Sequence, residues 1–156
     1  MQDRKYLFKE VKKIVVKIGT SSLTRKDGSF NKEFAFSIAK QVSELKNSGK
    51  EIILVSSGAI GTGCEALGFA ERPKSIPLKQ ATAAVGQSLL MQEWIKVFEK
   101  YGLKVAQILL TYDAFSDRKT YLNLRNSMCS LLELGVIPII NENDPICVHE
   151  IRETFG

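Results

Sequence analysis

Apolar residues recur along this chain in two different periods, which predicts strands separated by helices. Four short runs are rich in β-branched and aliphatic residues, and each ends at a glycine or a polar residue, as buried strands do: residues 13–18, 51–55, 104–110 and 136–140. Pro138 lies in the last run and cannot donate a hydrogen bond to a neighbouring strand, which counts against a regular strand there.

The segments between these runs carry apolar residues at helical spacing. Residues 31–48 predict a helix with Gly49 as its C′ residue, and residues 76–101 predict a longer helix with Pro77 near its start. A third helix ends near Gly135. The apolar stripes that mark the three helices are Phe34, Ile38, Val42 and Leu45; Val85, Leu89, Leu90, Trp94, Val97, Phe98 and Tyr101; and Tyr121, Leu124, Met128 and Leu131.

Apolar strands that alternate with helices indicate an α/β fold. We expect an open, mainly parallel sheet with helices on both faces and right-handed crossovers. The length of 156 residues suits about one domain, and no repeat, low-complexity tract or linker marks a boundary. The hydrophobic fraction of 44% is that of an ordinary globular protein.

Composition and charge narrow the function classes. No run approaches the roughly 18 apolar residues of a membrane span, and the first residues carry Asp3 and Glu10 without an apolar centre. We therefore expect no membrane anchor, no secretory signal and a cytoplasmic location. Cys64, Cys129 and Cys147 are far apart and form no CxxC pair, which favours reduced thiols over disulfides or a thiolate metal site. The net charge of +5 suits an anionic ligand, but the basic residues are scattered, so we expect no nucleic-acid surface.

Candidate chemistry follows from the predicted sheet, because ligands of open parallel sheets bind beyond the carboxyl ends of the strands. Four short segments occupy those positions: residues 19–22, 56–59, 111–113 and 141–144. Small or polar residues fill three of them where helices should begin. The four segments are therefore expected to form one site.

The first of these turns follows Lys17, a lysine inside an otherwise apolar strand. A buried unpaired ammonium is costly, so we expect an anion or carboxylate beside it. One interpretation is a cation aimed at phosphate oxygens, with Gly19 and Thr20 allowing backbone N–H groups to approach. The other is an edge lysine that reaches solvent.

The second turn, residues 56–63, follows a strand and is expected to open a helix. The free N–H groups of a helix N-terminus suit a carboxylate or phosphate, and Gly58 would permit close approach. A glycine-rich connection with Ser57 as a simple N-cap is the alternative.

The last turn gathers two carboxylates and two amides directly after an apolar strand: Asn141, Glu142, Asn143 and Asp144. Pro145 favours an extended Asp144 whose carboxylate points outward, where it could hold a substrate ammonium group or a metal-bound water. An Asx-rich turn without further purpose is the alternative.

Other polar residues are weaker candidates. The only histidine, His149, is expected at the solvent-exposed surface, and Trp94 is expected in the core. Residues 80–87 are rich in small side chains and suit close helix packing as well as substrate contact. A group beyond the third strand either shapes a pocket or caps a helix at Thr120; its members are Asp113, Asp117, Arg118 and Asn123.

Five segments, in their order along the chain, carry a resemblance to a known family: VVKIGTSSLT at 15–24, SSGAIGTG at 56–63, AAVGQ at 83–87, QILLT at 107–111 and PIINENDP at 138–145. Together they resemble the glutamate 5-kinases of the amino acid kinase family. The resemblance implies an αβα sandwich that uses ATP and Mg²⁺ to phosphorylate the γ-carboxylate of L-glutamate, the first step of proline biosynthesis. It also implies L-proline as a feedback inhibitor and a homo-oligomer when full-length.

The same resemblance implies roles for individual residues. Lys17 matches the lysine that contacts the transferring phosphoryl group, and Gly19, Thr20 and Ser21 match the phosphate-side loop. No metal-ligating side chain is implied. The residues expected to bind glutamate are Ser57, Gly58, Ala59, Asn141, Asn143 and Asp144.

Members of this family continue past the position of Gly156 with an Asp-Asn-Asp segment and a nucleotide-holding second half, and many add a PUA domain. Residues 1–156 are therefore expected to be an incomplete domain, the glutamate-binding half, that is inactive alone. Two other interpretations stay open: a kinase for a related carboxylate or phosphate substrate, and a non-catalytic amino-acid-binding or regulatory fragment.

Overall fold

The structure is a computed structural model that describes residues 10–25 and 29–146. Strands and helices alternate along the chain as predicted, with boundaries shifted by a few residues. The elements are β1 (Lys13–Lys17), α2 (Thr20–Leu23), α3 (Lys32–Asn47), β2 (Glu51–Val55), α4 (Ala59–Leu67), α5 (Ile76–Glu99), β3 (Val105–Leu110), the 3₁₀ helix η1 (Tyr112–Phe115), α6 (Arg118–Glu133) and β4 (Ile137–Glu142).

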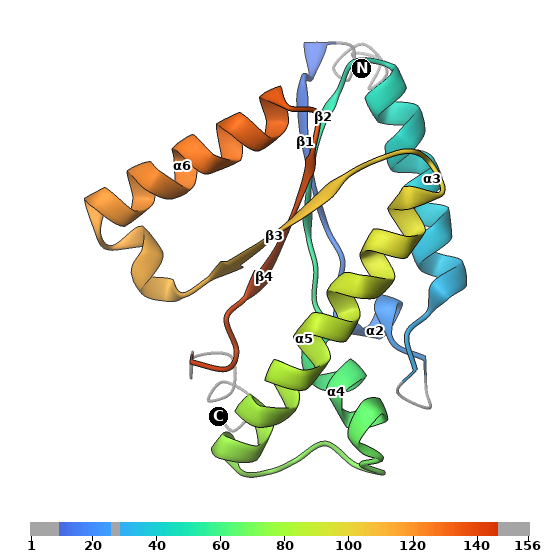
Figure 1. The fold of residues 1–156 in the computed structure, drawn as a ribbon, viewed down its shortest axis with the longest axis vertical. Helices are drawn as coiled ribbons and strands as arrows, with labels where there is room; N and C mark the ends of the chain where they lie inside the picture. Colours follow the sequence, from blue (N-terminus) through green and yellow to red (C-terminus); the bar gives the residue numbers. More distant parts are fainter. Residues whose placement is uncertain (1–9, 26–28, 147–156) are drawn as a thin grey trace, which may run out of the picture.

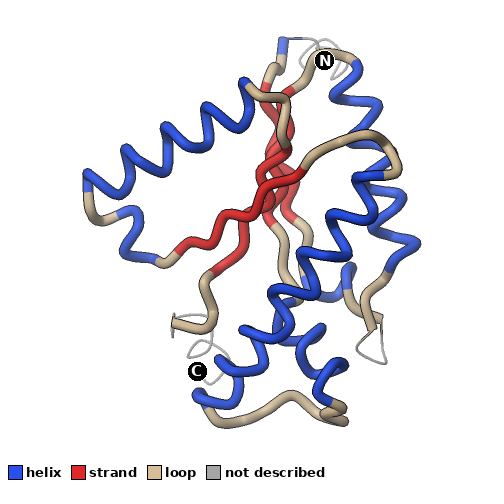
Figure 2. The backbone as a smooth tube through the Cα atoms, viewed as in Figure 1, coloured by secondary structure: helices blue, strands red, loops and turns tan. Residues whose placement is uncertain are grey.

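The four described strands form one parallel sheet in the order β1-β2-β4-β3. Helices α3 and α5 lie on one side of this sheet and α6 on the other (Figure 1). The tube in Figure 2 shows the strands as the central layer between the helices. The predicted α/β fold, with a parallel sheet and helices on both faces, is therefore confirmed. None of the described helices is both long and apolar enough to cross a membrane.

The core lies between the sheet and helices α3 and α5. Ile52 and Leu54 of β2 are fully buried there, and Trp94 and Phe98 of α5 pack on the same side. On α3 the buried residues are Ala35, Ala39 and Val42. Of the predicted stripe, Val42 is thus buried, while Phe34, Ile38 and Leu45 are only partly buried. Small side chains at the centre of α3 allow the helix to approach the sheet closely, and the larger ones fill its flanks.

One face of the edge strand β1 is open among the described residues. Lys13, Val15 and Lys17 alternate with half-buried residues, and Val15 is 62% exposed. The expectation that the apolar strands are covered on both faces is therefore wrong for β1.

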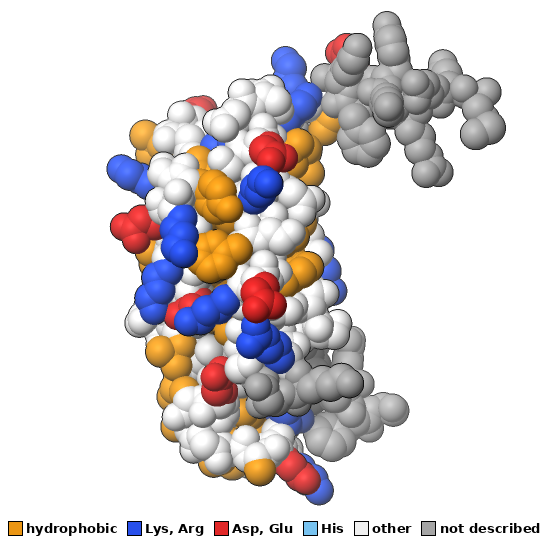
Figure 3. Space-filling model, turned by 90° about the vertical axis from the view of Figure 1, so that its right-hand side faces the viewer, with side chains coloured by type: hydrophobic (Ala, Val, Ile, Leu, Met, Phe, Trp, Pro, Cys, Tyr) orange, Lys and Arg blue, Asp and Glu red, His pale blue; other side chains and the backbone are white. Residues whose placement is uncertain are grey.

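Figure 3 shows another face of the molecule, the right-hand side of the view in Figure 1. On this face basic and acidic side chains are interspersed with apolar ones.

The predicted fourth strand forms with Pro138 inside it, as the interior strand β4. The N–H of Ile137 donates to the Lys104 carbonyl beside β3, so the nitrogen of the next residue faces β2. Pairing between β2 and β4 begins only at Leu54 and Ile139. The missing N–H of Pro138 therefore falls where no bond to β2 is made, and the strand tolerates it.

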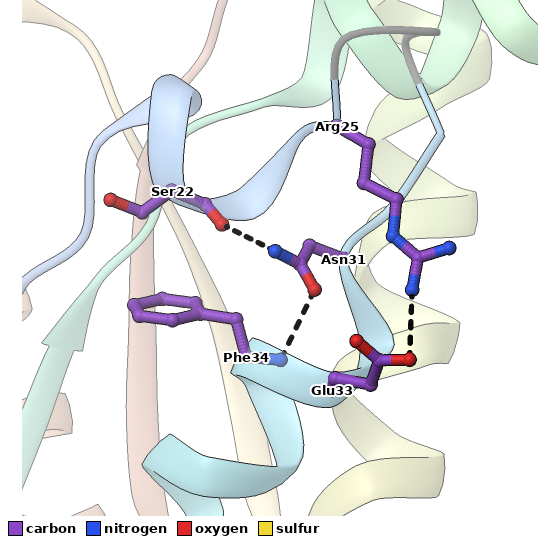
Figure 4. Close-up of polar contacts among 5 residues, drawn as sticks. All are labelled: Ser22, Arg25, Asn31, Glu33 and Phe34. Carbon is purple, nitrogen blue, oxygen red and sulfur yellow. Dashed lines mark hydrogen bonds and ion pairs between the residues drawn. The ribbon is translucent and has the colours of Figure 1, made fainter.

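Helix α3 has an asparagine at its N-cap and a glycine at its C′ position. Asn31 accepts a hydrogen bond from the Phe34 N–H at 3.2 Å and donates to the Ser22 carbonyl at 3.4 Å, while Arg25 pairs with Glu33 at 3.3 Å (Figure 4). These contacts join the start of α3 to α2, through Ser22, and to the segment that follows α2, through Arg25. Gly49, directly after α3, has a φ of +82°, the left-handed conformation expected of a C′ glycine.

Helices α4 and α5 cross in backbone contact. A Cβ added at Gly63 would lie 2.0 Å from the Thr82 carbonyl oxygen, and one added at Gly86 would lie 1.8 Å from the Ala59 carbonyl oxygen. Only glycine fits at these two positions. The small residues at 80–87 therefore serve close helix packing, one of the two roles expected for them.

Candidate functional site

The carboxyl ends of all four strands surround one cavity of about 390 Å³. Lys17 enters it from β1, Ser56 and Ser57 from the turn after β2, and Thr111 from the end of β3. The segments after β2 and β3 lead to helices on opposite faces of the sheet (Figure 1), and such a divergence opens a crevice between strands. The remaining lining residues are Val55, Leu110, Tyr112, Phe115, Ile140, Asn141 and Glu142.

A smaller cavity of about 70 Å³ adjoins the same turns. Ser57 and Asn141 line both cavities, so the two share a wall. Most of the residues expected to bind glutamate therefore gather around it. Its lining residues are Thr20, Ser57, Gly58, Ala59, Ile60, Arg72, Asn141 and Asp144.

Lys17 is exposed, because it projects from the open face of β1. The expectation that burial forces an anionic partner on it is therefore wrong. A Cβ built on Gly19 would lie 3.8 Å from the Lys17 Nζ, so the ammonium group sits over the first turn and at the large cavity. It can serve there as a cation that reaches an anionic ligand.

The turn after β2 presents a helix N-terminus to the small cavity. Gly58, not Ser57, is the N-cap of α4, with a φ of +106° that favours glycine. The first helical bond runs from the Thr62 N–H to the Gly58 carbonyl, which leaves the preceding N–H groups of α4 without a helical partner. Ser57, freed from capping, instead pairs its hydroxyl with that of Thr20 at 2.8 Å.

The polar segment at the end of β4 is split between the strand and a turn. Strand β4 continues through Asn141 and Glu142, and Asn141 is buried with its amide bonded to Gln87. Asp144 lies in the turn and is 8% exposed, so the expectation of an outward-pointing carboxylate is wrong. Asp144 lines the small cavity instead, together with Ser57 and the start of α4.

Three of the expected site residues stand apart from this wall. Gly19 and Asn143 line neither cavity, and the Asn143 N–H is used in a bond to the Leu110 carbonyl. Ser21 lies with Thr20 in a third groove of about 410 Å³ that also contains Arg25 and Arg72. The structure therefore brings Lys17, Ser57, Gly58, Ala59, Asn141, Asp144 and Thr20 together around two adjoining cavities.

Other candidates have structural roles or lie outside the described residues. Asp117 caps α6: its carboxylate accepts hydrogen bonds from the Thr120 N–H at 2.7 Å and hydroxyl at 2.6 Å, and these bonds lower the pKa of Asp117. Burial raises the pKa of the Cys64 thiol, with an opposing effect from Arg72. His149 and Cys147 lie outside the described residues.

Two site residues carry no sequence signal that singles them out. Phe115 lines the large cavity, and Arg72 lines both the small cavity and the third groove. Gln87 does carry a sequence signal, because it is a polar residue on a buried helix face. In the structure it contacts Asn141 at the end of β4.

The described residues include no group of three or more His, Cys, Asp or Glu side chains able to hold a metal ion. Glu142 is the carboxylate that lines the large cavity. Mg²⁺ in nucleotide sites is commonly held by substrate phosphates and waters with one or two carboxylates. The described residues fit an ion that arrives with phosphates, and they form no protein cage for one.

Comparisons with known proteins agree with this fold. The sequence model of the amino acid kinase family matches residues 12–154. A glutamate 5-kinase of Methanococcoides burtonii is 64% identical over 156 residues, which cover all of this chain and 42% of that protein. A glutamate 5-kinase of Methanosarcina mazei is 59% identical over 163 residues, with 42% of its length covered, and one of Caldanaerobacter subterraneus is 51% identical over 140 residues. The chain thus spans less than half the length of these curated relatives.

Proposed function

The chain belongs to the amino acid kinase family, and we propose that it forms the glutamate-binding half of a kinase that transfers the γ-phosphoryl group of ATP to the γ-carboxylate of L-glutamate. The observation that carries this proposal is the shared wall of Ser57 and Asn141 between the two cavities, with Asp144 on one side and Lys17 on the other. The relatives named glutamate 5-kinase support the choice of substrate.

The small cavity suits the amino acid end of glutamate. Asp144 is a buried carboxylate that can accept hydrogen bonds from the α-ammonium group. The unpaired N–H groups at the start of α4, with the Ser57 hydroxyl, can donate to a carboxylate. Asn141, which lines both cavities, can form a hydrogen bond with the substrate between them.

The large cavity suits the phosphoryl transfer. Glutamate bound with its ammonium group at Asp144 would extend its γ-carboxylate past Ser57 and Asn141 toward Lys17. The γ-carboxylate has an ordinary pKa of about 4.3 and is already ionised at neutral pH, so it attacks phosphorus without a general base. The site must instead hold two anions together and offset their charge, which is the role of Lys17.

ATP is the proposed phosphoryl donor, and Mg²⁺, carried on its phosphates, would offset part of their charge. Residues 1–156 supply the acceptor side, and residues outside this chain supply most of the nucleotide side. We further propose that the whole protein is a homo-oligomeric enzyme of proline biosynthesis, located in the cytoplasm, with L-proline as a feedback inhibitor.

The test is the formation of γ-glutamyl phosphate by the full-length protein that contains this chain. ATP, Mg²⁺ and L-glutamate are supplied with hydroxylamine, which traps the acyl phosphate as a hydroxamate that is measured by its iron complex. We expect hydroxamate with L-glutamate and none with the two analogues. The side chain of L-aspartate is too short to bring its carboxylate to the phosphoryl group, and N-acetyl-L-glutamate lacks the free ammonium group. Equal rates with N-acetyl-L-glutamate would refute the role of Asp144.

The 156-residue chain alone should give no hydroxamate. Calorimetry of the full-length protein with L-glutamate and L-proline then distinguishes half of a kinase site from a non-catalytic binding module. Binding of L-glutamate or L-proline by a full-length protein that fails to form hydroxamate would favour a non-catalytic binding module over a kinase.

A further inference from the structure

We propose that helix α5 sets the positions of the two polar turns of the site through the buried side chains of Gln87 and Trp94. What the turns bind rests on the proposed function; how they are held rests on hydrogen bonds within the structure. Gln87 and Trp94 are about two helical turns apart, so they lie on one face of α5. Neither lines the two cavities, so each acts as a positioning residue through a neighbour.

Trp94 holds the turn after β2. Its Nε1 is 3.1 Å from the Ser56 Oγ, in a buried contact. An indole N–H can only donate, so the Ser56 hydroxyl must accept from it and keeps its own hydrogen for another partner. That partner is the Ser57 carbonyl at 3.3 Å. A directed chain of bonds therefore runs from α5 through Ser56 to the backbone of Ser57.

The indole ring has little freedom to turn away from this bond. Trp94 is fully buried, with the Phe30 ring edge-on at 5.9 Å between centroids and the Phe98 ring tilted at 5.7 Å. Aromatic pairs at these separations add to the stability of the packed ring. The direction of the Trp94 N–H is therefore fixed by the core.

Gln87 holds the end of β4. The Asn141 Nδ2 donates to the Gln87 Oε1, and the Asn141 Oδ1 accepts from the Glu142 N–H at 3.0 Å. Both ends of the Asn141 amide are thereby oriented. Gln87 and Asn141 are buried, so the loss of either partner would leave a buried polar group without its bond.

The helix itself is fixed against α4 at the residue before Gln87. Gly86 contacts the Ala59 carbonyl so closely that no side chain fits between them. Helix α5 thus touches three parts of the site wall: the start of α4 at Ala59, the end of β4 at Asn141, and the turn after β2 at Ser56. The spacing of these groups is set before any ligand arrives, which reduces the ordering cost of binding.

The experiment is a pair of double-mutant cycles in the full-length protein, read as kcat and KM for L-glutamate. Gln87→Met keeps the side-chain shape and removes the acceptor, and we expect kcat/KM to fall about tenfold, as for one buried hydrogen bond. In an Asn141→Ala background the same change should cost less than about twofold, because Gln87 then has no partner to position.

Trp94→Phe should lower kcat/KM in the same way, and its effect should vanish in a Ser56→Ala background. Val97→Ala is the matched control, since Val97 is buried on the same helix and makes no polar contact with the site. It should lower the melting temperature and leave kcat/KM for L-glutamate near that of the wild type.

Two results would overturn the positioning role. One is a fall in kcat/KM that persists in the Asn141→Ala and Ser56→Ala backgrounds. The other is an equal fall in kcat/KM in Val97→Ala at the same loss of stability. A wild-type protein that forms no hydroxamate refutes the proposed function instead. Hydrogen exchange of the Trp94 indole N–H then decides the inference without activity. Ser56→Ala should accelerate that exchange at least about tenfold; unchanged exchange shows that the bond does not hold the turn.

Discussion

Replacing Gly86 by alanine should force helices α4 and α5 apart, because their crossing leaves no space for a side chain. The added Cβ would lie 1.8 Å from the Ala59 carbonyl oxygen and 2.4 Å from the Gly63 nitrogen, whereas ordinary contact begins near 3.4 Å. Both obstacles are backbone atoms, which cannot rotate away. The two helices must therefore separate by roughly 1.6 Å at this point, the difference between the first distance and an ordinary contact.

The expected cost follows from two opposing effects. Overpacking costs about 1–3 kcal/mol and sometimes more, and a rigid backbone obstacle places Gly86→Ala at the upper end. The better helix propensity of alanine returns about 1 kcal/mol. A net loss of about 2 kcal/mol corresponds to a fall in melting temperature of roughly 4–8 °C for a protein of about 150–250 residues, and to a smaller fall for a larger one.

Thermal unfolding of the full-length protein, followed by circular dichroism, measures this loss. Gly61→Ala is the matched control on α4, because the nearest neighbours of its added Cβ are side-chain atoms, of Thr24 at 3.3 Å and of Arg72 at 3.9 Å. The KM for L-glutamate should also rise in Gly86→Ala, since Ala59 lines the small cavity. If Gly86→Ala melts at or above the temperature of Gly61→Ala, the reasoning from backbone contact is wrong.

Three further outcomes are expected. Lys17→Ala should lower kcat at least about 100-fold and change the KM for L-glutamate little, because Lys17 lies on the phosphoryl side of the site; an unaltered kcat excludes that role. Asp144→Ala should chiefly raise the KM for L-glutamate, by about tenfold or more, with steady-state kinetics as the measurement and an unchanged KM as the contrary result. The Thr120 bonds lower the pKa of Asp117, so this cap stabilises the fold above the ordinary value of 3.8 and is lost as the pH falls through the lower folded pKa. The difference in melting temperature between wild type and Asp117→Ala should therefore narrow as the pH falls from about 6 to about 3. The difference between Asp117→Asn, which keeps an acceptor, and Asp117→Ala should change little over the same range, because neither variant carries this carboxyl group.

Periodicity was sufficient to predict the order of strands and helices, because burial repeats every second or every three to four residues in each element. It placed Pro138 in the fourth strand, residues 136–140, but it could not show why a proline is tolerated there. A proline in an interior strand is tolerated only when its nitrogen faces an unpaired stretch of the neighbour, and that depends on register between β2 and β4. Register is a property of two segments that are far apart in the sequence.

The candidate site was predictable to the level of its turns, since parallel strands bring their carboxyl ends together. The orientation of individual side chains was not. Lys17 is exposed because it projects from the open face of β1, and Asp144 is buried where the turn after β4 and the start of α4 line one cavity. Both outcomes depend on neighbours that local patterns do not reveal. Gln87 is a polar residue on a buried helix face, which the sequence can show, but its partner Asn141 is known only from the fold.

The strand order has a consequence for how the protein folds. Strand β4 is the last described strand in the chain, yet it inserts between β2 and β3, which do not pair with each other. A nascent chain that ends before β4 therefore has a β1–β2 pair and a β3 strand without a partner, both with unsatisfied edges. Completion of the sheet must wait for long-range contacts, which slows folding. Because β4 also carries Asn141, the site cannot be complete before this strand closes the sheet, and a chain in which β4 fails to insert would have neither a complete sheet nor a complete site.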